Sequence, residues 1–382
     1  MFDSLVRFVR EQYGTNEYIP LHAPVFRGRE RELVLDTIDS TFVSSVGAYV
    51  DQFEKDIAAF TGVPRAVAVM NGTAALHAAL KLAEVKPGDL VVTQSLTFVA
   101  TCNAISYCNA EPLFVDVDRH TLGLSPSALE AWLDEHAFID DHGNCLTLAE
   151  HRRIRACLPM HTFGHPVDLD ALISVCDRWH LVLIEDAAES LGSYYKGRHT
   201  GGFGKIGVLS FNGNKIMTTG GGGMLLTDEQ TGKRAKHLTT TAKIPHPYEF
   251  VHDEVGYNYR MPNLNAALGC AQLEQLPTFL DSKRTLAMRY IQFFKNADLQ
   301  PIVEPDGCHS NYWLNGVICR DKVQRDALLK ATNDAGVMTR PVWTLMTRLP
   351  FYTHALQGPL SNAKWLEDRV VNLPSSVLPA GA

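Results

Sequence analysis

The sequence of 382 residues lacks the features that mark nucleic-acid-binding, membrane and secreted proteins. It carries 35 basic and 42 acidic residues, for a formal net charge of −7, without a long run of like charge. A basic surface for nucleic acid is therefore not expected. No apolar run reaches membrane-spanning length, and the amphipathic amino terminus has neither the apolar core nor the cleavage site of a signal peptide. We expect a cytoplasmic protein without a nucleic-acid or membrane partner.

The cysteines lack the spacing of a metal or redox site. There are eight, and no two of them are separated as in CxxC. Several, such as Cys157 and Cys176, lie in apolar segments, which is typical of reduced and buried thiols. The sequence predicts neither a disulfide framework nor a metal site.

The hydrophobic pattern is that of an α/β protein. Between residues 55 and 230, short apolar runs alternate with amphipathic ones, as in parallel βα units. Strands are predicted at 66–70, 90–93, 112–116, 156–160, 181–184, 208–211 and 222–227. Helices are predicted at 74–82, 125–135 and 168–180, with further long helices over 262–295. The pattern favours a doubly wound sheet over a barrel, and the polar stretch 136–155 is expected to be a loop insertion.

The turn between the first predicted strand and helix has the composition of a phosphate site. It reads Asn71-Gly72-Thr73-Ala74, and Gly72 allows the backbone to turn tightly. The free N–H groups of a first helical turn bind phosphate without a basic side chain. The alternative is an ordinary helix cap made by Asn71 or Thr73, and this segment alone favours that simpler interpretation.

Two further candidate side chains follow predicted strands. Phe98 is placed to stack on a planar ring, although a single phenylalanine is more often part of the core. Asp186 follows the apolar run 181–184, where a carboxylate either caps a helix or accepts a proton-bearing nitrogen. Ligands of open α/β sheets gather at the carboxyl ends of the strands, which favours a functional role for Asp186.

Lys215 supplies an amine that is able to form an imine. It follows Ser210, whose hydroxyl suits a phosphate, and precedes the glycine run 220–223, which permits close approach of a bulky ligand. A solvated loop lysine is the alternative. The segment 202–207 matches GxGxxG, but it precedes a predicted strand instead of following one, so a nicotinamide site is not expected there.

The order of these features resembles the DegT/DnrJ/StrS-type sugar aminotransferases, which have the aspartate aminotransferase fold and use pyridoxal phosphate (PLP). The resemblance covers nearly the whole chain. It is carried by the segments 19–22, 53–54, 71–76, 97–101, 114–118, 185–188, 210–215, 256–261, 266–269 and 372–374. It implies an N-terminal arm (1–35), a large PLP-binding domain with a mainly parallel, doubly wound sheet and a linking helix (36–275), and a smaller α+β C-terminal domain (276–382).

The resemblance also implies roles for single residues. Lys215 would form the Schiff base with PLP and act as the base, and Asp186 would keep the pyridine nitrogen protonated. Phe98 would stack on the ring, and Glu189, where the family more often has glutamine, would lie near the ring hydroxyl. The phosphate would be held by Gly72, Thr73, Ala74, Ser210 and, from the neighbouring subunit of a homodimer, Asn258.

The reaction implied is transfer of an amino group, from L-glutamate, to carbon 4 of a nucleotide-linked 4-keto-6-deoxy-hexose. UDP- or GDP-4-keto-6-deoxy-N-acetylglucosamine is expected, in the biosynthesis of a surface polysaccharide, such as O-antigen, or a nonulosonic acid. The segments 42–47, 50–54 and 215–223 look most like the legionaminic-acid-pathway (LegC-type) branch. Candidates for the sugar side of the site, each equally explicable as structural, are His161, Arg260, His309 and Trp343.

There are three alternatives to an aminotransferase: another PLP enzyme, a protein without catalytic activity, and an oxidoreductase. A PLP-dependent sugar dehydratase resembles this family but has histidine where Lys215 stands. A non-catalytic PLP-binding regulator is disfavoured because the whole set of site residues is present and no DNA-binding module precedes it. A nicotinamide oxidoreductase rests only on the misplaced glycine motif.

Overall fold

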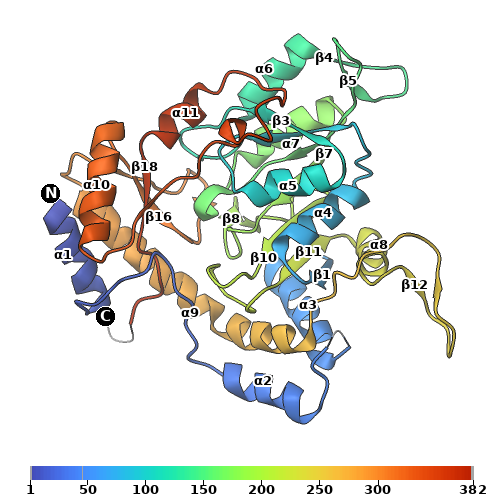
Figure 1. Ribbon diagram of the computed structural model, residues 1–382, viewed down its shortest axis with the longest axis horizontal. Helices are drawn as coiled ribbons and strands as arrows, with labels where there is room; N and C mark the ends of the chain where they lie inside the picture. Colours follow the sequence, from blue (N-terminus) through green and yellow to red (C-terminus); the bar gives the residue numbers. More distant parts are fainter. Residues whose placement is uncertain (1, 45, 380–382) are drawn as a thin grey trace.

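A seven-stranded sheet forms the centre of the computed structural model, which describes residues 2–44 and 46–379 (Figure 1). Its order is β1-β11-β10-β7-β6-β2-β3. The strands are β1 (Arg65–Val69), β2 (Leu90–Gln94), β3 (Glu111–Val115), β6 (Ile154–Leu158), β7 (Val182–Asp186), β10 (Ile206–Ser210) and β11 (Gly223–Thr227). Only β11 runs antiparallel to its neighbours among the pairs of this sheet. The predicted α/β fold with a mainly parallel sheet is confirmed.

Helices cover both faces of this sheet, as in a doubly wound fold. One apolar cluster joins the strands to α4 (Gly72–Leu82), α5 (Val99–Tyr107) and α8 (Glu229–Thr239). The clusters on the opposite face include α3 (Ala48–Thr61), α6 (Pro126–His136) and α7 (Leu169–Arg178). The helix starts predicted at Ser125 and Asp168 are real N-caps, because these side chains accept hydrogen bonds from the N–H groups of Ala128 and Ala171.

The polar insertion 136–155 is not simply a loop, so that prediction was incomplete. It contains a hairpin of β4 (Ala137–Ile139) and β5 (Cys145–Thr147). The carboxylate of Asp140 shapes its turn by accepting hydrogen bonds from the backbone N–H groups of His142 and Asn144. Strands of three residues are too short to leave a clear alternation in the sequence.

A single 32-residue helix, α9 (Asn263–Phe294), replaces the several helices predicted for this region and contains Pro277. Its first half packs against α3 and α2 (Glu30–Asp39). Residues of its second half share an apolar cluster with α1 (Phe2–Tyr13) and the second sheet. The helix runs without interruption through residue 275, where we predicted the boundary between the two domains. The three domain limits themselves stay predictions.

The second sheet has four strands in the order β14-β16-β18-β17. They are β14 (Gln300–Pro301), β16 (Asn315–Ile318), β17 (Arg340–Pro341) and β18 (Val370–Leu373), with α10 (Lys322–Asp334) and α11 (Ser361–Glu367) beside them. A small sheet of β8 (Tyr194–Tyr195), β9 (Arg198–His199) and β15 (Cys308–His309) joins the two parts of the chain. The site described below lies where segments from both parts meet.

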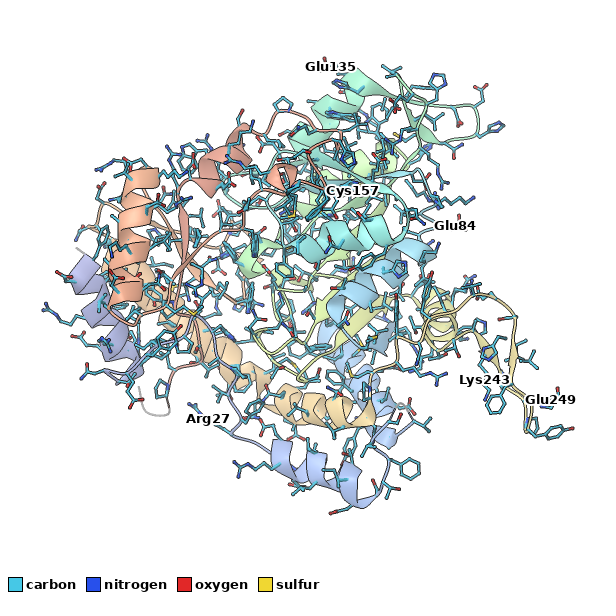
Figure 2. All side chains as sticks on the ribbon, viewed as in Figure 1. Arg27, Glu84, Glu135, Cys157, Lys243 and Glu249 are labelled. Atoms are coloured by element: carbon cyan, nitrogen blue, oxygen red, sulfur yellow. The ribbon has the colours of Figure 1, made fainter. Side chains whose placement is uncertain are left out.

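A hairpin of β12 (Lys243–Ile244) and β13 (Val251–His252) extends away from the body of the protein (Figures 1 and 2). Its tip and the chain after it expose the large apolar side chains of Tyr248, Phe250 and Val255. Elsewhere, the eight cysteines are free thiols, and seven of them are buried. Among the described residues, no helix is both long and apolar enough to cross a membrane.

Candidate active site

A cavity of about 320 Å³ opens at the carboxyl ends of β1, β7 and β10. Its wall on the other side is formed by Trp313 and Trp343, which belong to the part of the chain that carries the second sheet. Seven of the residues predicted for a cofactor site line this one cavity: Gly72, Thr73, Phe98, Asp186, Glu189, Ser210 and Lys215. The fold therefore collects, from segments almost 150 residues apart in sequence, the side chains that the sequence singled out.

One end of the cavity is the start of α4. The side chain of Asn71 caps this helix by accepting a hydrogen bond from the N–H of Ala74, at 2.8 Å. Gly72 and Thr73 line the cavity, and the N–H groups of a first helical turn have no partner within the helix. Ala74 differs from the prediction, because its N–H is bonded to Asn71 and it does not line the cavity.

The glycine at this turn leaves space that a side chain would fill. A Cβ atom on Gly72 would lie 2.9 Å from the Cβ and 3.1 Å from the hydroxyl oxygen of Ser210. With glycine, the open backbone, the helix N-terminus and the Ser210 hydroxyl face the same space. This is the donor set of an anion site that needs no basic side chain.

Asp186 occupies the floor of the cavity and is almost fully buried. Its carboxylate accepts hydrogen bonds from the Thr101 hydroxyl, at 2.8 Å, and from the N–H of Ala188, at 3.2 Å. Burial raises its pKa, and these two donors, with the charge of Lys215, offset that effect only in part. A positively charged group in the cavity would stabilise the ionised form of this carboxylate.

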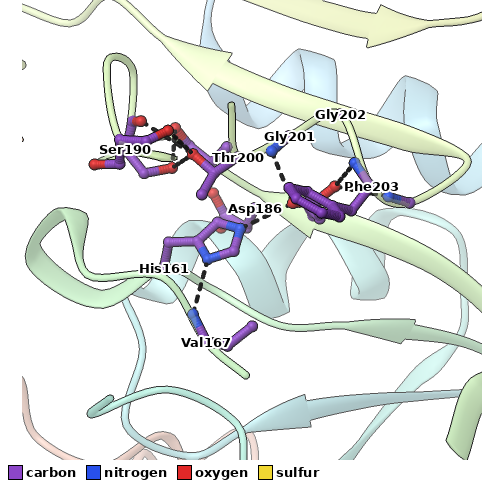
Figure 3. Close-up of polar contacts among 12 residues, drawn as sticks. His161, Val167, Asp186, Ser190, Thr200, Gly201, Gly202 and Phe203 are labelled. Carbon is purple, nitrogen blue, oxygen red and sulfur yellow. Dashed lines mark hydrogen bonds and ion pairs between the residues drawn. The ribbon is translucent and has the colours of Figure 1, made fainter. Parts of the chain in front are cut away.

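Glu185, the residue before Asp186, is fully buried and contacts His161 and the loop that starts at Gly201, both labelled in Figure 3. Its carboxylate accepts hydrogen bonds from the imidazole of His161, at 3.1 Å, and from three backbone N–H groups, at 2.6–2.7 Å: those of Gly201, Phe203 and Gly204. Since the N–H of Val167 donates to Nδ1 of His161, the imidazole proton is on Nε2 and points to Glu185. Burial raises the pKa of Glu185, but these donors outweigh it and hold the pKa below its ordinary value.

Lys215 projects into the cavity from the loop after β10. Its Nζ donates a hydrogen bond to Oε1 of Glu189 at 3.3 Å and lies 4.2 Å from the ring centre of Trp313. The other oxygen of Glu189 accepts a hydrogen bond from the N–H of Phe163, at 2.9 Å. The indole N–H of Trp313 in turn donates to the carbonyl of Asn214, at 2.7 Å, so this tryptophan also fixes the backbone next to Lys215.

Aromatic side chains complete the wall near Phe98. This side chain is half exposed and lies with its ring centre 6.4 Å from that of Trp343. Trp343 also contacts Phe163, at 5.2 Å between ring centres. A planar ring above Asp186 would therefore meet apolar surface, as expected for Phe98.

Three of the four sugar-side candidates lie outside the cavity, so these predictions need correction. His161 is fully buried against Glu185, and Arg260 donates to the carbonyl of Thr240. His309 lies on a surface groove beside α1 and α9. Polar residue type alone suggested them, and their position in the fold was not visible in the sequence. Only Trp343 lines the cavity.

Asn258, predicted to serve the neighbouring subunit, is exposed and does not line the cavity of its own chain. Trp313 and Asn214 line it but were missed by the sequence analysis. Asn214 directly precedes Lys215 in the segment 210–215, so its position next to the lysine indicated a place in the site. Trp313 lies 98 residues after Lys215 in the sequence, and no local pattern relates the two positions.

Comparison with known proteins places the chain in a family. Residues 25–379 match the DegT/DnrJ/EryC1/StrS aminotransferase family. The chain belongs to this family. It is 37% identical over 361 residues to the GDP-perosamine synthase of Escherichia coli O157:H7, covering 94% of this chain and 93% of that protein.

Solved structures agree with this assignment. The aminotransferase TlmJ from Streptoalloteichus hindustanus has a TM-score of 0.84 and 29% identity, covering 94% of this chain and 93% of that one. A Streptococcus pneumoniae protein solved in its PLP form shares the fold, with a TM-score of 0.83, 23% identity, and coverage of 94% and 93%. The chain is a PLP-dependent sugar aminotransferase.

The residues of the cavity fit this cofactor. The space left by Gly72 beside Ser210 suits a phosphate. Among the described residues, no cationic side chain is hydrogen bonded to the buried carboxylate of Asp186, which suits a protonated ring nitrogen. Lys215 provides the amine on the same cavity wall. The phosphate, the ring nitrogen and the aldehyde of PLP would therefore each meet a group of suitable chemistry in this cavity.

Proposed function

We propose that this enzyme transfers an amino group from L-glutamate to carbon 4 of a nucleotide-linked 4-keto-6-deoxy-hexose. One observation carries the proposal: an amine, a buried carboxylate and a helix N-terminus line one cavity of about 320 Å³. The same constellation disfavours a dehydratase, since the reactive position holds Lys215 and not histidine. It also disfavours a non-catalytic binding protein, which needs no base.

Each residue has a role that follows from its surroundings. The N–H groups of Gly72 and Thr73 and the hydroxyl of Ser210 bind the cofactor phosphate, and Asp186 holds a proton on the ring nitrogen by charge pairing. When bound, PLP supplies an electron sink that stabilises negative charge on the carbon next to the migrating nitrogen. Phe98 orients the ring by packing against its face.

Lys215 is the base in this proposal. Its Nζ takes the proton from the α carbon of the amino donor and, in the second half of the reaction, returns a proton to the sugar carbon that gains the amine. Trp313 and Trp343 line the cavity beside this amine, and their apolar rings reduce its contact with water. The amine must be unprotonated when it acts.

The nucleotide is proposed on weaker grounds than the reaction. The name of the E. coli O157:H7 relative, GDP-perosamine synthase, favours a GDP-linked substrate. The segments 42–47, 50–54 and 215–223 favour the legionaminic-acid-pathway branch, with an N-acetylated sugar. The relative's name and these segments are both compatible with a GDP-linked 4-keto-6-deoxy-N-acetylhexosamine, which we propose as the substrate. Its product would enter the biosynthesis of a nonulosonic acid or a surface polysaccharide.

We further propose that the enzyme is a homodimer with shared sites. The tip of the β12–β13 hairpin and the chain after it expose Tyr248, Phe250 and Val255, and such apolar surface is typical of an interface. Asn258, which follows this hairpin in sequence, is exposed and would reach the phosphate site of a partner subunit. Light scattering after size-exclusion chromatography should give twice the chain mass, and a monomer at assay concentration would contradict this part.

The reaction is tested by chemistry and by a substrate panel. Purified protein should show an absorbance band near the visible edge, and borohydride should remove it and add the cofactor mass to the peptide that contains Lys215. UDP- and GDP-linked 4-keto-6-deoxy sugars, with and without an N-acetyl group, are then incubated with L-glutamate and read by mass. Amination of none of them, or labelling of another lysine, would refute the proposal.

A further inference from the structure

The contact between Lys215 and Glu189 is unusual among the buried charges of this protein. The Lys215 side chain is 12% exposed and that of Glu189 is 2% exposed, and the N···O distance is 3.3 Å. Apart from Glu189, Lys215 Nζ faces the ring of Trp313. Oε1 of Glu189 meets only this amine among the described hydrogen bonds, while Oε2 is bonded to the N–H of Phe163.

Such a pair is poorly compensated as two full charges. A buried ion pair repays its desolvation only when short contacts and further hydrogen bonds surround both partners. Glu185 has those contacts and Glu189 does not. A neutral carboxylic acid beside a neutral amine avoids the cost of two dry charges while keeping one hydrogen bond.

The groups around Glu189 shift its pKa in opposite directions, and the net effect is a raised pKa. Of the titratable groups on the segments packed around it, Lys215 and Asp186 face its carboxylate. The histidines of the neighbouring turn, His161 and His165, are hydrogen bonded to other side chains. Burial raises the pKa of Glu189, the Lys215 charge and the Phe163 N–H lower it in part, and the Asp186 charge raises it further.

We propose that Glu189 is a further catalytic residue, which accepts the ammonium proton of Lys215. An N–H bond of Nζ breaks, its electron pair stays on nitrogen, and an O–H bond forms at Oε1 of Glu189. The proton is conserved within the pair, so no other reactant is needed. The inference rests on the proposed function, in which the amine of Lys215 acts as a base and must be neutral.

Glu189→Gln tests this directly, because glutamine accepts the same hydrogen bond from Phe163 but takes no proton from an ammonium ion. At neutral pH, kcat should fall by about 10²-fold, as for loss of an acid–base group, with KM for L-glutamate changed less than about threefold. As pH rises, solvent removes the ammonium proton, so the difference from wild type should close. A merely structural role predicts a difference that does not depend on pH.

A second measurement uses the cofactor-free protein. Infrared difference spectra should show a carboxylic-acid C=O band at neutral pH that vanishes in Glu189→Gln. Glu54→Gln is the matched control, because Glu54 is also buried and paired with a lysine, Lys236, but lies outside the cavity. Glu54→Gln should leave both the band and the pH profile of kcat unchanged.

The proposal is overturned if the band is absent from wild type, or if the loss of activity in Glu189→Gln is the same at all pH values. It is supported when the band is present and the loss closes with rising pH. Failure of the proposed function looks different, because wild type would then aminate no keto sugar. In that case the infrared band still reports on the Glu189–Lys215 pair alone.

Discussion

Glu185 and Asp186 are consecutive, both buried and both acidic, yet their surroundings shift their pKa values in opposite directions. For Glu185, burial raises the pKa, but the hydrogen bond from His161 and the backbone N–H groups lower it more. For Asp186, burial raises the pKa and the donors Thr101 and Ala188 do not cancel it. The two side chains point to opposite faces of β7 because side chains alternate along a strand.

The opposite pKa shifts correspond to two different roles of a buried carboxylate, one in stabilising the fold and one in binding a ligand. Glu185 receives all of its hydrogen bonds from the protein and ties the loop that starts at Gly201 to the sheet. From the described part of the chain, Asp186 receives two hydrogen bonds, and it lines the cavity, where a cationic group could pair with its charge. Pairs of acids whose surroundings push their pKa values apart are typical of active sites, and of these two only Asp186, which accepts fewer hydrogen bonds, lines the cavity.

The contrast between Glu185 and Asp186 has a functional meaning only if the cavity next to Asp186 is the reaction site. Lys215→Ala should lower kcat by roughly 10⁴-fold or more, because it removes the base, while PLP still binds without a covalent link. Amino transfer is measured by mass, and cofactor binding by absorbance. Lys205→Ala is the control, since Lys205 is exposed and outside the cavity. Near-normal turnover by Lys215→Ala would refute the assignment.

Asp186→Asn should separate chemistry from stability. It keeps the shape but removes the charge that pairs with a protonated ring nitrogen, so kcat should fall by about 10³-fold. The free energy of unfolding of the cofactor-free protein should change by no more than about 1 kcal/mol, since Asp186 makes few hydrogen bonds. Kinetics and urea unfolding measure the two effects. A large loss of stability with normal kcat would show that Asp186, like Glu185, stabilises the fold and does not take part in catalysis.

Glu185→Gln should give the reverse result. The amide NH₂ would face backbone donors, so the free energy of unfolding should fall by about 3 kcal/mol, with kcat changed less than about threefold. Because the folded pKa of Glu185 is lowered, its charge stabilises the fold above the pKa of an unfolded glutamate, about 4.3. The contribution is lost as pH falls through the lower, folded pKa. Urea unfolding of both proteins at pH 7 and below pH 4 should therefore show the gap shrinking.

Thr101→Val should have the smallest effect of these substitutions, and it should increase the difference in pKa between Glu185 and Asp186. It removes the hydroxyl that donates to Asp186 at 2.8 Å without changing the size of the side chain much. Ionised Asp186 then loses a donor and its pKa should rise further, so kcat should fall about threefold to tenfold, most strongly on the acidic side. The pH dependence of kcat is the measurement. An unchanged profile would mean that the cofactor alone sets the charge of Asp186.

Much of the large sheet could be predicted because its strands are buried apolar runs. The seven predicted strands overlap β1, β2, β3, β6, β7, β10 and β11. The direction of β11 was not visible, since an antiparallel strand buried on both faces reads like a parallel one. The hairpin β4–β5 was missed because each of its strands has three residues.

The cavity could be predicted where residues sit next to strand ends, as Gly72, Asp186 and Ser210 do. Trp313 could not, because it reaches Lys215 through the packing of the second sheet. His161 was predicted for the sugar side but is bonded to Glu185, since a polar side chain after a strand is equally suited to either face. Residue type thus indicated the chemistry, while tertiary packing decided which side chains take part.

Pro277 in α9 has a consequence for how the cavity adapts. Proline has no N–H to donate to the carbonyl of Leu273, so the helix is easily bent at this point. The residues before it pack on α2 and α3, while Lys283 beyond it donates to the carbonyl of Trp313. A bend at Pro277 would therefore shift Trp313 relative to the large sheet and change the width of the cavity beside Lys215. Sugars of different size could be accommodated in this way.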